Sequence, residues 1–289
     1  MSQRGIQGIY QGPPPHMVGD GFRVRGYLPG PERLVQEVSP FLLMDYHPPY
    51  AYPPTTAQRG VGAHPHRGFE TVTMVYEGKV AHRDTAGNSG VIGPGEVQWM
   101  TAASGVLHEE FHEKEFAAAG GILHSVQLWV NLPAKDKMSA PRYQALTNDK
   151  ITEVALDQAG SVVRLIAGEY AGVKGPALSF TPVTIFDVRL KAGAEATFSL
   201  PSEQNLFVLV AQGELSANGS PVQEQDLVVF DHAGESISLK AASDSIVLVL
   251  GGEPIREPIA SYGPFVMNYR AELIQAIEDL EAGKFGVLV

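Results

Sequence analysis

Short hydrophobic stretches alternate with turn-forming residues along almost the whole chain. Residues 71–76 and 125–130 are rich in β-branched and apolar side chains and are bounded by glycine or polar residues, as strands are. In the second half such stretches recur about every ten residues, a spacing that predicts a β-sandwich or jelly roll. The predicted strands of that half are residues 162–166, 184–190, 206–211, 227–230 and 246–250.

The end of the chain has a different pattern. Asn268 is a suitable N-cap and Gly283 a suitable stop for a helix. Between them hydrophobic residues recur at helical spacing, which is typical of packing rather than ligand binding. We expect this short C-terminal helix to cover a barrel face. The stripe consists of Leu273, Ile274, Ile277 and Leu280.

A weak internal repeat predicts two copies of one barrel. Residues 70–80 resemble residues 204–215, and residues 94–100 resemble residues 224–230. Residues 131–150 are polar and show no sustained period, so we place the linker there. The prediction is an all-β protein with an N-terminal barrel in residues 1–140 and a C-terminal barrel, with the helix, in residues 141–289.

Composition agrees with this fold and excludes several functions. Gly and Pro, 31 and 21 of 289 residues, together make up about 18% of the chain, against a usual ~12%. This excess favours short elements joined by tight turns. The net charge of −11, without a basic run, disfavours nucleic-acid binding. The absence of cysteine excludes disulfides and thiolate metal sites. With neither a signal-like start nor an 18-residue apolar run, we expect a cytoplasmic protein without membrane contact.

Two pairs of side chains carry the candidate chemistry. His64 and His66 are two positions apart, and Pro65 between them favours an extended backbone, so both leave the same face of the chain. His108 and Glu110 repeat that spacing on a second predicted strand. Two such pairs facing each other across a barrel would bring three imidazoles and one carboxylate to one point. We predict a transition-metal site in the N-terminal barrel.

The ligand types restrict the metal and its role. Imidazole and carboxylate without thiolate suit iron, manganese, nickel, cobalt or copper better than a structural zinc. Four protein ligands leave up to two open positions on an octahedral metal, which implies catalysis or sensing. In the second half, roughly Ser199, Leu200 and Pro201 stand where the first half has its histidine pair. The C-terminal barrel is therefore expected to lack this site.

Other residues near these pairs have less specific interpretations. Glu70 is a rival carboxylate, either a ligand or a partner of a ligand histidine. Glu109 should point away from the site, His112 is expected at the strand end, and Arg67 is expected on the surface. Single histidines are interpreted as hydrogen-bonded structural residues, namely His47, His82 and His124. Apolar neighbours could form a pocket for a flat aromatic ligand or ordinary core: Met44, Phe69, Trp99, Met100 and Leu107.

Five longer segments extend these motifs, and the first three of them are highly specific. They are HPHRGFETVTMVYEG (64–78), HRDTAGNSG (82–90), PGEVQWMTAASGVLHEE (94–110), VQLWVNLP (126–133) and GEPIREPIASYGPFVMN (252–268). Together they resemble the pirin family of the cupin superfamily, over nearly the whole chain. The resemblance implies two tandem cupin barrels with the metal in the N-terminal one. Family ligands fall on His64, His66, His108 and Glu110, while Gln98 stands where cupins in general have a ligand histidine.

The resemblance also implies functions. Family members look like quercetin 2,3-dioxygenases, and some act as iron-dependent regulators that bind proteins. We therefore expect one divalent transition metal, iron first, in an enzyme that cleaves a flavonol-like substrate with O2, with Glu110 as the base. The alternative is a non-enzymatic iron-dependent redox or metal sensor that binds a protein partner. A metal-free sugar-binding or isomerase cupin would require structural histidines. We expect a monomer, because the second barrel can act as an internal partner.

Overall fold

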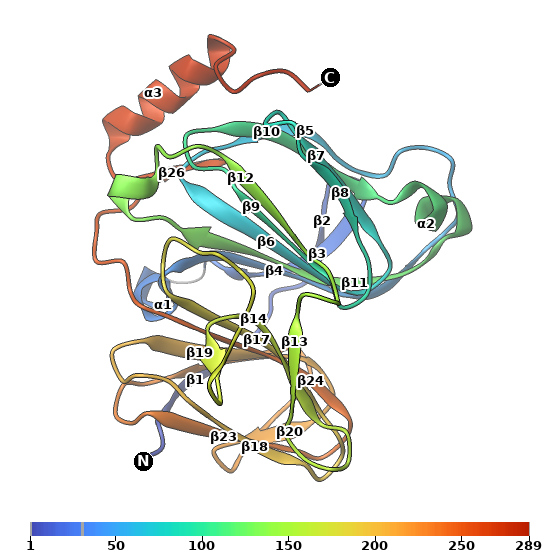
Figure 1. Cartoon of the computed structure of the whole chain (residues 1–289), viewed down its shortest axis with the longest axis vertical. Coiled ribbons are helices and arrows are strands. Elements are labelled where there is room, and N and C mark those ends of the chain that lie inside the picture. The colour runs from blue at the N-terminus through green and yellow to red at the C-terminus, as the bar shows by residue number, and fades with distance from the viewer. Residues whose placement is uncertain (1, 30–31, 289) are drawn as a thin grey trace. The chain divides into compact units, whose positions relative to one another are not determined.

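The computed structural model describes residues 2–29 and 32–288 (Figure 1). The chain forms two compact units. We call one the histidine unit, which comprises Pro14–Leu28, Phe41–Asn148 and Ile255–Val289. The apolar unit comprises Met1–Pro13, Pro29–Pro40 and Asp149–Pro254. No helix in the described part of the chain is long and apolar enough to cross a membrane.

Two antiparallel sheets make up the barrel of the histidine unit. The larger sheet has the order β12-β9-β6-β11-β4-β3-β2, and the smaller has the order β5-β10-β7-β8. Helix α2 (Lys114–Ala119) follows β10, and a 3-10 turn, η1 (Ala134–Asp136), follows β11. The strands are β2 (His16–Val18), β3 (Phe22–Leu28), β4 (Phe41–Tyr52), β5 (Gly60–His66), β6 (Phe69–Glu77), β7 (Val80–Asp84), β8 (Ser89–Ile92), β9 (Val97–Thr101), β10 (Val106–His112), β11 (Gly121–Asn131) and β12 (Arg142–Leu146).

The apolar unit repeats this plan strand by strand. Its sheets have the orders β1-β22-β19-β24-β17-β14-β13 and β18-β23-β20-β21, so β18 and β23 correspond to β5 and β10. This confirms an all-β fold with two tandem barrels. The elements are β1 (Ile6–Gln11), α1 (Glu32–Glu37), β13 (Thr152–Ala155), β14 (Val162–Ala167), β15 (Glu169–Tyr170), β16 (Val173–Lys174), β17 (Val183–Leu190), β18 (Glu195–Ser199), β19 (Asn205–Gln212), β20 (Leu215–Ala217), β21 (Ser220–Val222), β22 (Asp226–Phe230), β23 (Ser236–Ala241) and β24 (Ser245–Gly252).

The division of the chain differs from a single boundary at residue 140. The first strand, β1, pairs with β22 and so belongs to the apolar unit, with Ile9 opposite Val228. Buried Arg4 fixes the segment before it, because its guanidinium donates to the carbonyls of Pro201 at 2.6 Å and Gln204 at 2.8 Å. Because of these contacts, the first 13 residues belong to the unit formed mainly by the second half of the chain, and each unit is built from segments that alternate along the sequence.

The C-terminal helix belongs to the histidine unit. It is α3 (Arg270–Glu281) and follows the hairpin of β25 (Ala260–Tyr262) and β26 (Phe265–Met267). The helix begins after Tyr269 rather than Asn268, since the Glu272 carboxylate accepts from the backbone N–H groups of both residues. Leu273 packs with Phe265 and Met267, whereas Ile274 of the predicted stripe is 51% exposed.

The turn between β5 and β6 depends on two residues of one motif. Gly68 has φ +92°, and a Cβ there would lie 1.9 Å from the Val266 carbonyl oxygen, so only glycine fits. The expectation that Arg67 lies on the surface is wrong. Its side chain is buried because it pairs with Asp279 at 2.9 Å and lies over the Phe285 ring at 4.6 Å. The turn that follows His66 is therefore fixed by backbone and ion-pair contacts.

Candidate metal centre

Three of the predicted ligands lie together inside the histidine unit. Strands β5 and β10 pair antiparallel with His108 opposite His64, and His66 lies two positions farther along β5. Ring centroids are 4.2 Å apart for His64 and His108 and 4.8 Å apart for each other pair. One nitrogen from each ring lies within 4.8 Å of the other two. Neighbouring strands thus bring the histidines together as the spacing predicted.

The protonation of these rings suits metal binding. Burial, together with nearby His64, lowers the pKa of His66 to about 3. Burial and the neighbouring histidines also hold the pKa of His108 well below its ordinary value. His64 donates from Nδ1 to the Gly62 carbonyl at 2.8 Å, which leaves Nε2 as its free nitrogen. Nε2 of His108 is buried without a hydrogen-bond partner, so its lone pair is available to a metal ion.

Glu110 lies beside this cluster in a hydrogen-bonded position. Its Oε1 accepts from Gln98 Nε2 at 2.8 Å and from Thr73 Oγ1 at 3.3 Å, and its Oε2 accepts from Gln127 Nε2 at 2.8 Å. A register shift in β10 separates Glu110 from His108. The carboxylate forms a second possible metal group with His108 and His82. A single sphere of three histidines and Glu110 stays a prediction.

Tyr143 fixes the amide that holds Glu110. Its hydroxyl donates to Gln98 Oε1 at 3.4 Å, so the NH2 end of the amide faces the carboxylate. Burial raises the pKa of Tyr143 to about 12, with further contributions from Asp84 and Glu110, so the phenol remains a donor at neutral pH. Gln98, at the position of the general cupin ligand, is therefore a partner of Glu110.

A cavity of about 370 Å³ opens onto these side chains. Its wall combines apolar and polar groups, and Trp129 stacks on Phe69 behind it at 4.2 Å and 27°. Asp45 also faces the cavity, and burial raises its pKa to about 6, with His16 opposing the shift. The lining includes Phe22, Leu43, Asp45, His47, His64, His66, Thr73, Glu110, Gln127 and Trp129.

Several residues weighed as neighbours of the site lie elsewhere. Glu70 is three positions from Thr73 on β6 and so faces the opposite side of the sheet, where it accepts from Thr101 at 2.6 Å. Burial raises its pKa to about 7. Met44 and Trp99 also alternate away from the cavity, since their strand neighbours Asp45 and Gln98 face inward. Counting alternate residues from His66 places Glu70 on the face of the histidines, but the turn at Gly68 interrupts the strand, so the alternation of β6 starts anew after it.

The single histidines mostly have the structural roles expected of them. His112 donates to the Gly21 carbonyl at 2.7 Å, and His124 is hydrogen-bonded to Tyr46 at 3.0 Å. His47 contacts Ser125 at 2.5 Å but also lines the cavity. His82 is the residue that sequence reasoning undervalued. His82 and Asp84 lie two positions apart on β7, the same spacing as His64 and His66 on β5 and as His108 and Glu110 on β10. This spacing was the signal that could have identified His82.

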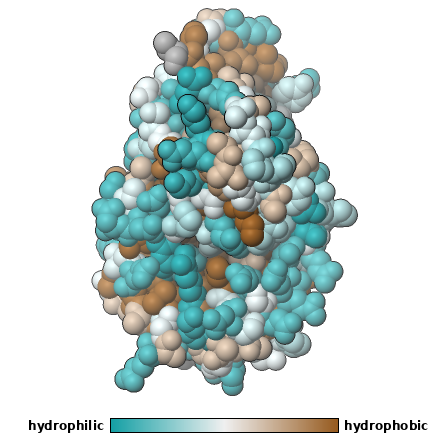
Figure 2. Space-filling model, turned by 90° about the vertical axis from the view of Figure 1, so that its right-hand side faces the viewer, coloured by the Kyte–Doolittle hydropathy of each residue, from teal (hydrophilic) through white to brown (hydrophobic). Residues whose placement is uncertain are grey.

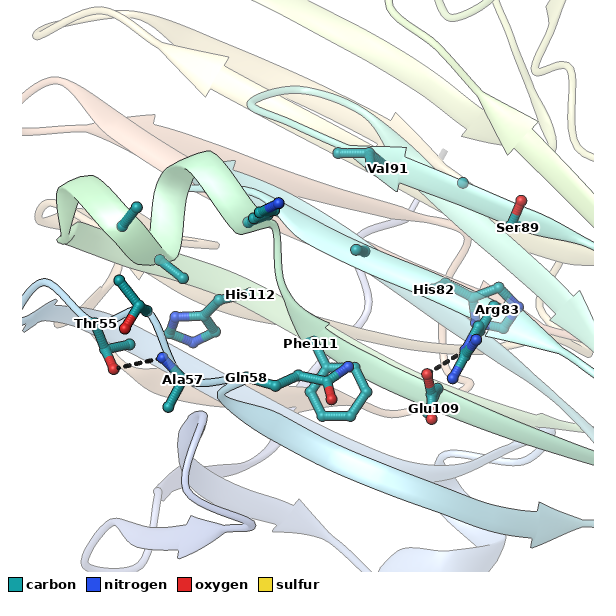
Figure 3. A pocket seen from close by; sticks show the side chains of 16 residues that line it. Thr55, Ala57, Gln58, His82, Arg83, Ser89, Val91, Glu109, Phe111 and His112 are labelled. Atoms are coloured by element: carbon teal, nitrogen blue, oxygen red, sulfur yellow. Dashed lines mark hydrogen bonds and ion pairs between the residues drawn. The ribbon is translucent and has the colours of Figure 1, made fainter. Parts of the chain in front are cut away.

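A second hollow lies on the other face of β10. Its volume is about 730 Å³, and we call it the outer groove (Figure 3). Glu109 and Phe111 point into it, whereas His108 and Glu110 alternate to the inside. Glu109 forms an ion pair with Arg83 there, which agrees with its predicted orientation away from the site. His82 appears in the same view and lines the groove from β7.

Two tandem antiparallel barrels with a histidine cluster in one of them define a bicupin. The match to known families agrees: residues 21–130 match the pirin model and residues 185–286 match the model of the pirin C-terminal cupin domain. The chain belongs to the pirin family.

Relatives and solved structures extend this result. A protein of Pseudomonas aeruginosa named "Putative quercetin 2,3-dioxygenase PA2418" is 50% identical over 97% of this chain and 98% of its own length. Pirin-like protein 2 of Arabidopsis thaliana is 39% identical, over 93% of this chain and 81% of its own. The crystal structure of a quercetin 2,3-dioxygenase from Acinetobacter baumannii superposes with a TM-score of 0.95, 47% identity and full coverage of both chains.

Proposed function

We propose that the protein is a metal-dependent dioxygenase that cleaves a flavonol-like aromatic substrate with O2. One divalent transition metal, iron first among the candidates, would be held by His64, His66 and His108 together with Glu110. Support comes from the names of similar proteins and from the donors, because His64, His66 and His108 form one possible metal group and Glu110 shares a second group with His108, without sulfur in either.

The observation that carries the proposal is the cavity beside the cluster. Its volume of about 370 Å³ falls within the range of small-molecule sites, roughly 300–1,000 Å³. The Trp129 ring, stacked on Phe69, provides a flat wall next to His66, whose ring lies 5.2 Å from the indole. A planar aromatic ligand with a hydroxyl directed at the histidines would fit these surfaces.

The side chains divide the work as follows. A bound metal would supply Lewis acidity, which lowers the pKa of a coordinated hydroxyl. Glu110 would accept the hydroxyl proton, since its carboxylate is oriented by Gln98 and Gln127. The apolar wall around it, including Phe22 and Trp129, would exclude water from the deprotonated substrate.

The alternative function is a metal or redox sensor that binds a protein partner. On the face shown in Figure 2, hydrophobic residues gather at the top of the view and are otherwise scattered among hydrophilic ones. The experiment below separates the two functions.

The test combines metal analysis with turnover. The purified protein is loaded with Fe²⁺, its metal content is measured, and quercetin loss, O2 consumption and carbon monoxide release are followed under air. We expect flavonol loss proportional to bound iron. Bound metal without turnover of quercetin and related flavonols, with iron and with manganese, nickel, cobalt and copper in turn, would reject the enzyme and favour the sensor. Protein that binds no transition metal would reject both.

A further inference from the structure

His82 and Asp84 form a buried pair next to the histidine cluster. They lie two positions apart on β7, which pairs with β10 so that His82 is opposite Glu110 and Asp84 opposite His108. Asp84 Oδ2 is 3.1 Å from His82 Nε2. The other ring nitrogen of His82, Nδ1, is 3.4 Å from Nδ1 of His108. An unbroken chain of contacts thus runs from a carboxylate to a predicted metal ligand.

Asp84 can act only as an acceptor in this chain. Its Oδ1 accepts from the backbone N–H groups of Ala86 at 2.9 Å and Asn88 at 3.0 Å, and the Asn88 amide donates to both oxygens. Three donor groups thus surround the carboxylate, which is the arrangement of an ionised acceptor, and Oδ2 takes a further proton donor from His82.

The direction of every bond follows from that end. His82 must donate from Nε2 to Asp84, which in the neutral ring leaves a lone pair on Nδ1. That lone pair accepts from Nδ1–H of His108, so the lone pair of His108 is on Nε2. Nε2 is the buried nitrogen of His108 that has no partner. The His108 ring that carries it lies 4.2 Å from the His64 ring and 4.8 Å from the His66 ring, between centroids.

We propose that Asp84 and His82 are positioning residues that fix the tautomer of His108 and so prepare its Nε2 for the metal. The inference rests on the proposed metal site, but it concerns residues that neither the family match nor the ligand motif assigns. A structural role for His82 would consist of its packing alone, since its ring stacks on Tyr143 at 4.9 Å and 15°. Packing does not depend on which nitrogen carries the proton.

Asp84→Asn is the discriminating variant. The asparagine oxygen can still accept from Ala86 and Asn88, so the turn is kept, while its NH2 group can donate to His82 Nε2. That reverses the chain and places the proton of His108 on Nε2, where it blocks the metal. We expect Co²⁺ affinity, measured by titration with the metal alone, to fall about 10–100-fold, as is typical when the partner of a ligand is lost. The melting temperature of the metal-free protein should stay close to that of the wild type.

A spectroscopic readout tests the tautomer directly. In the metal-free wild type, ¹⁵N NMR should show His108 protonated at Nδ1, and in Asp84→Asn at Nε2. Glu109→Gln is the matched control. It alters a carboxylate next to His108 on β10, but one that faces the outer groove and not the histidines. It should change neither the tautomer nor the affinity. Should Asp84→Asn fail to fold, His82→Phe preserves the stacking on Tyr143, removes the acceptor, and should weaken Co²⁺ binding about tenfold or more.

Three results would overturn the inference. Wild-type His108 protonated at Nε2 would contradict the chain outright, as would unchanged Co²⁺ affinity in folded Asp84→Asn. Co²⁺ binding that survives His64→Ala but not His82→Ala would show that the metal uses the second group, with His82 as a ligand. The failure of the proposed function is separate, because absent flavonol turnover leaves the tautomer and Co²⁺ results in place.

Discussion

The two barrels share one strand order and differ in what fills them. On β18 and β23 of the apolar unit, the inward positions hold Ala196, Phe198, Ile237 and Leu239, all part of one continuous core. The corresponding strands of the histidine unit, β5 and β10, carry His64, His66, His108 and Glu110. The same framework therefore serves as a packed core in one copy and as a polar cavity in the other. Polar residues on the larger sheet, among them Asp45, Thr73 and Gln127, add to this difference, while the sheet order is kept.

The largest expected effect comes from making the histidine unit resemble the apolar one. The triple variant His64→Ala, His66→Phe, His108→Leu places the side chains of Ala196, Phe198 and Leu239 at the equivalent positions, because His64 is opposite His108 as Ala196 is opposite Leu239. We expect complete loss of metal binding and of flavonol turnover, because every predicted imidazole ligand is gone. The melting temperature should equal or exceed that of the metal-free wild type, since buried polar groups that lack partners are removed. Metal analysis and thermal melts check this, and a folded variant that still binds one metal ion would refute the site.

Glu110→Gln separates the base from the ligands. The amide keeps the shape of the side chain but cannot accept a proton, so turnover should fall by about 10²–10⁴-fold, the usual contribution of a general base. Much of the metal should remain bound to the three histidines. Steady-state oxygen uptake per bound metal measures the effect. Turnover at the wild-type rate in that variant would remove Glu110 from the chemistry.

Phe198→Ala tests the other side of the comparison. Phe198 is fully buried in the core of the apolar unit, so its truncation should destabilise the protein by about 3–5 kcal/mol. Denaturant unfolding gives the value. A loss below about 1 kcal/mol would mean that this barrel is not the close-packed core that its side chains indicate.

Acid should affect the two units differently. Burial, with His124 and His112 nearby, lowers the pKa of His47 in the histidine unit to about 3, against an ordinary value of 6.5. The stabilisation from its neutral form is fully present above pH 6.5 and is lost as the pH falls from 6.5 towards 3. The one histidine of the apolar unit, His232, is exposed.

We therefore expect amide protection factors, which correct for the intrinsic exchange rate at each pH, to fall first in β4 and β11 between pH 6.5 and 4, and later in β19 and β24. His47→Gln should reduce that early fall. An equal loss of protection in both units, or an unchanged profile in His47→Gln, would contradict the assignment.

The sequence predicted the architecture because its signals are local. Period-two alternation and glycine turns revealed the strands, and the HPH and HEE motifs placed three imidazoles on adjacent strands. It could not reveal partners that come from distant segments, such as Tyr143 on β12 behind Gln98, or Asp45 on β4 in the cavity wall. Nor could it place Glu70, because the phase of the strand resets at Gly68. The His82 and Asp84 pair was visible as a spacing, but its meaning required the register of β7 against β10.

The pairing of β1 with β22 has a consequence for how the protein is made. A ribosome adds ~5–20 residues per second, so β1 waits on the order of ten seconds or more before its partner emerges. During that time the strand lacks its ladder with β22, and Arg4 lacks the carbonyls of Pro201 and Gln204 that hold it in the finished barrel. An unpaired strand is a template for wrong association. While this chain is being synthesised, β1 is thus exposed as an unpaired strand until β22 is made. A protein built from two consecutive barrels would not have this period.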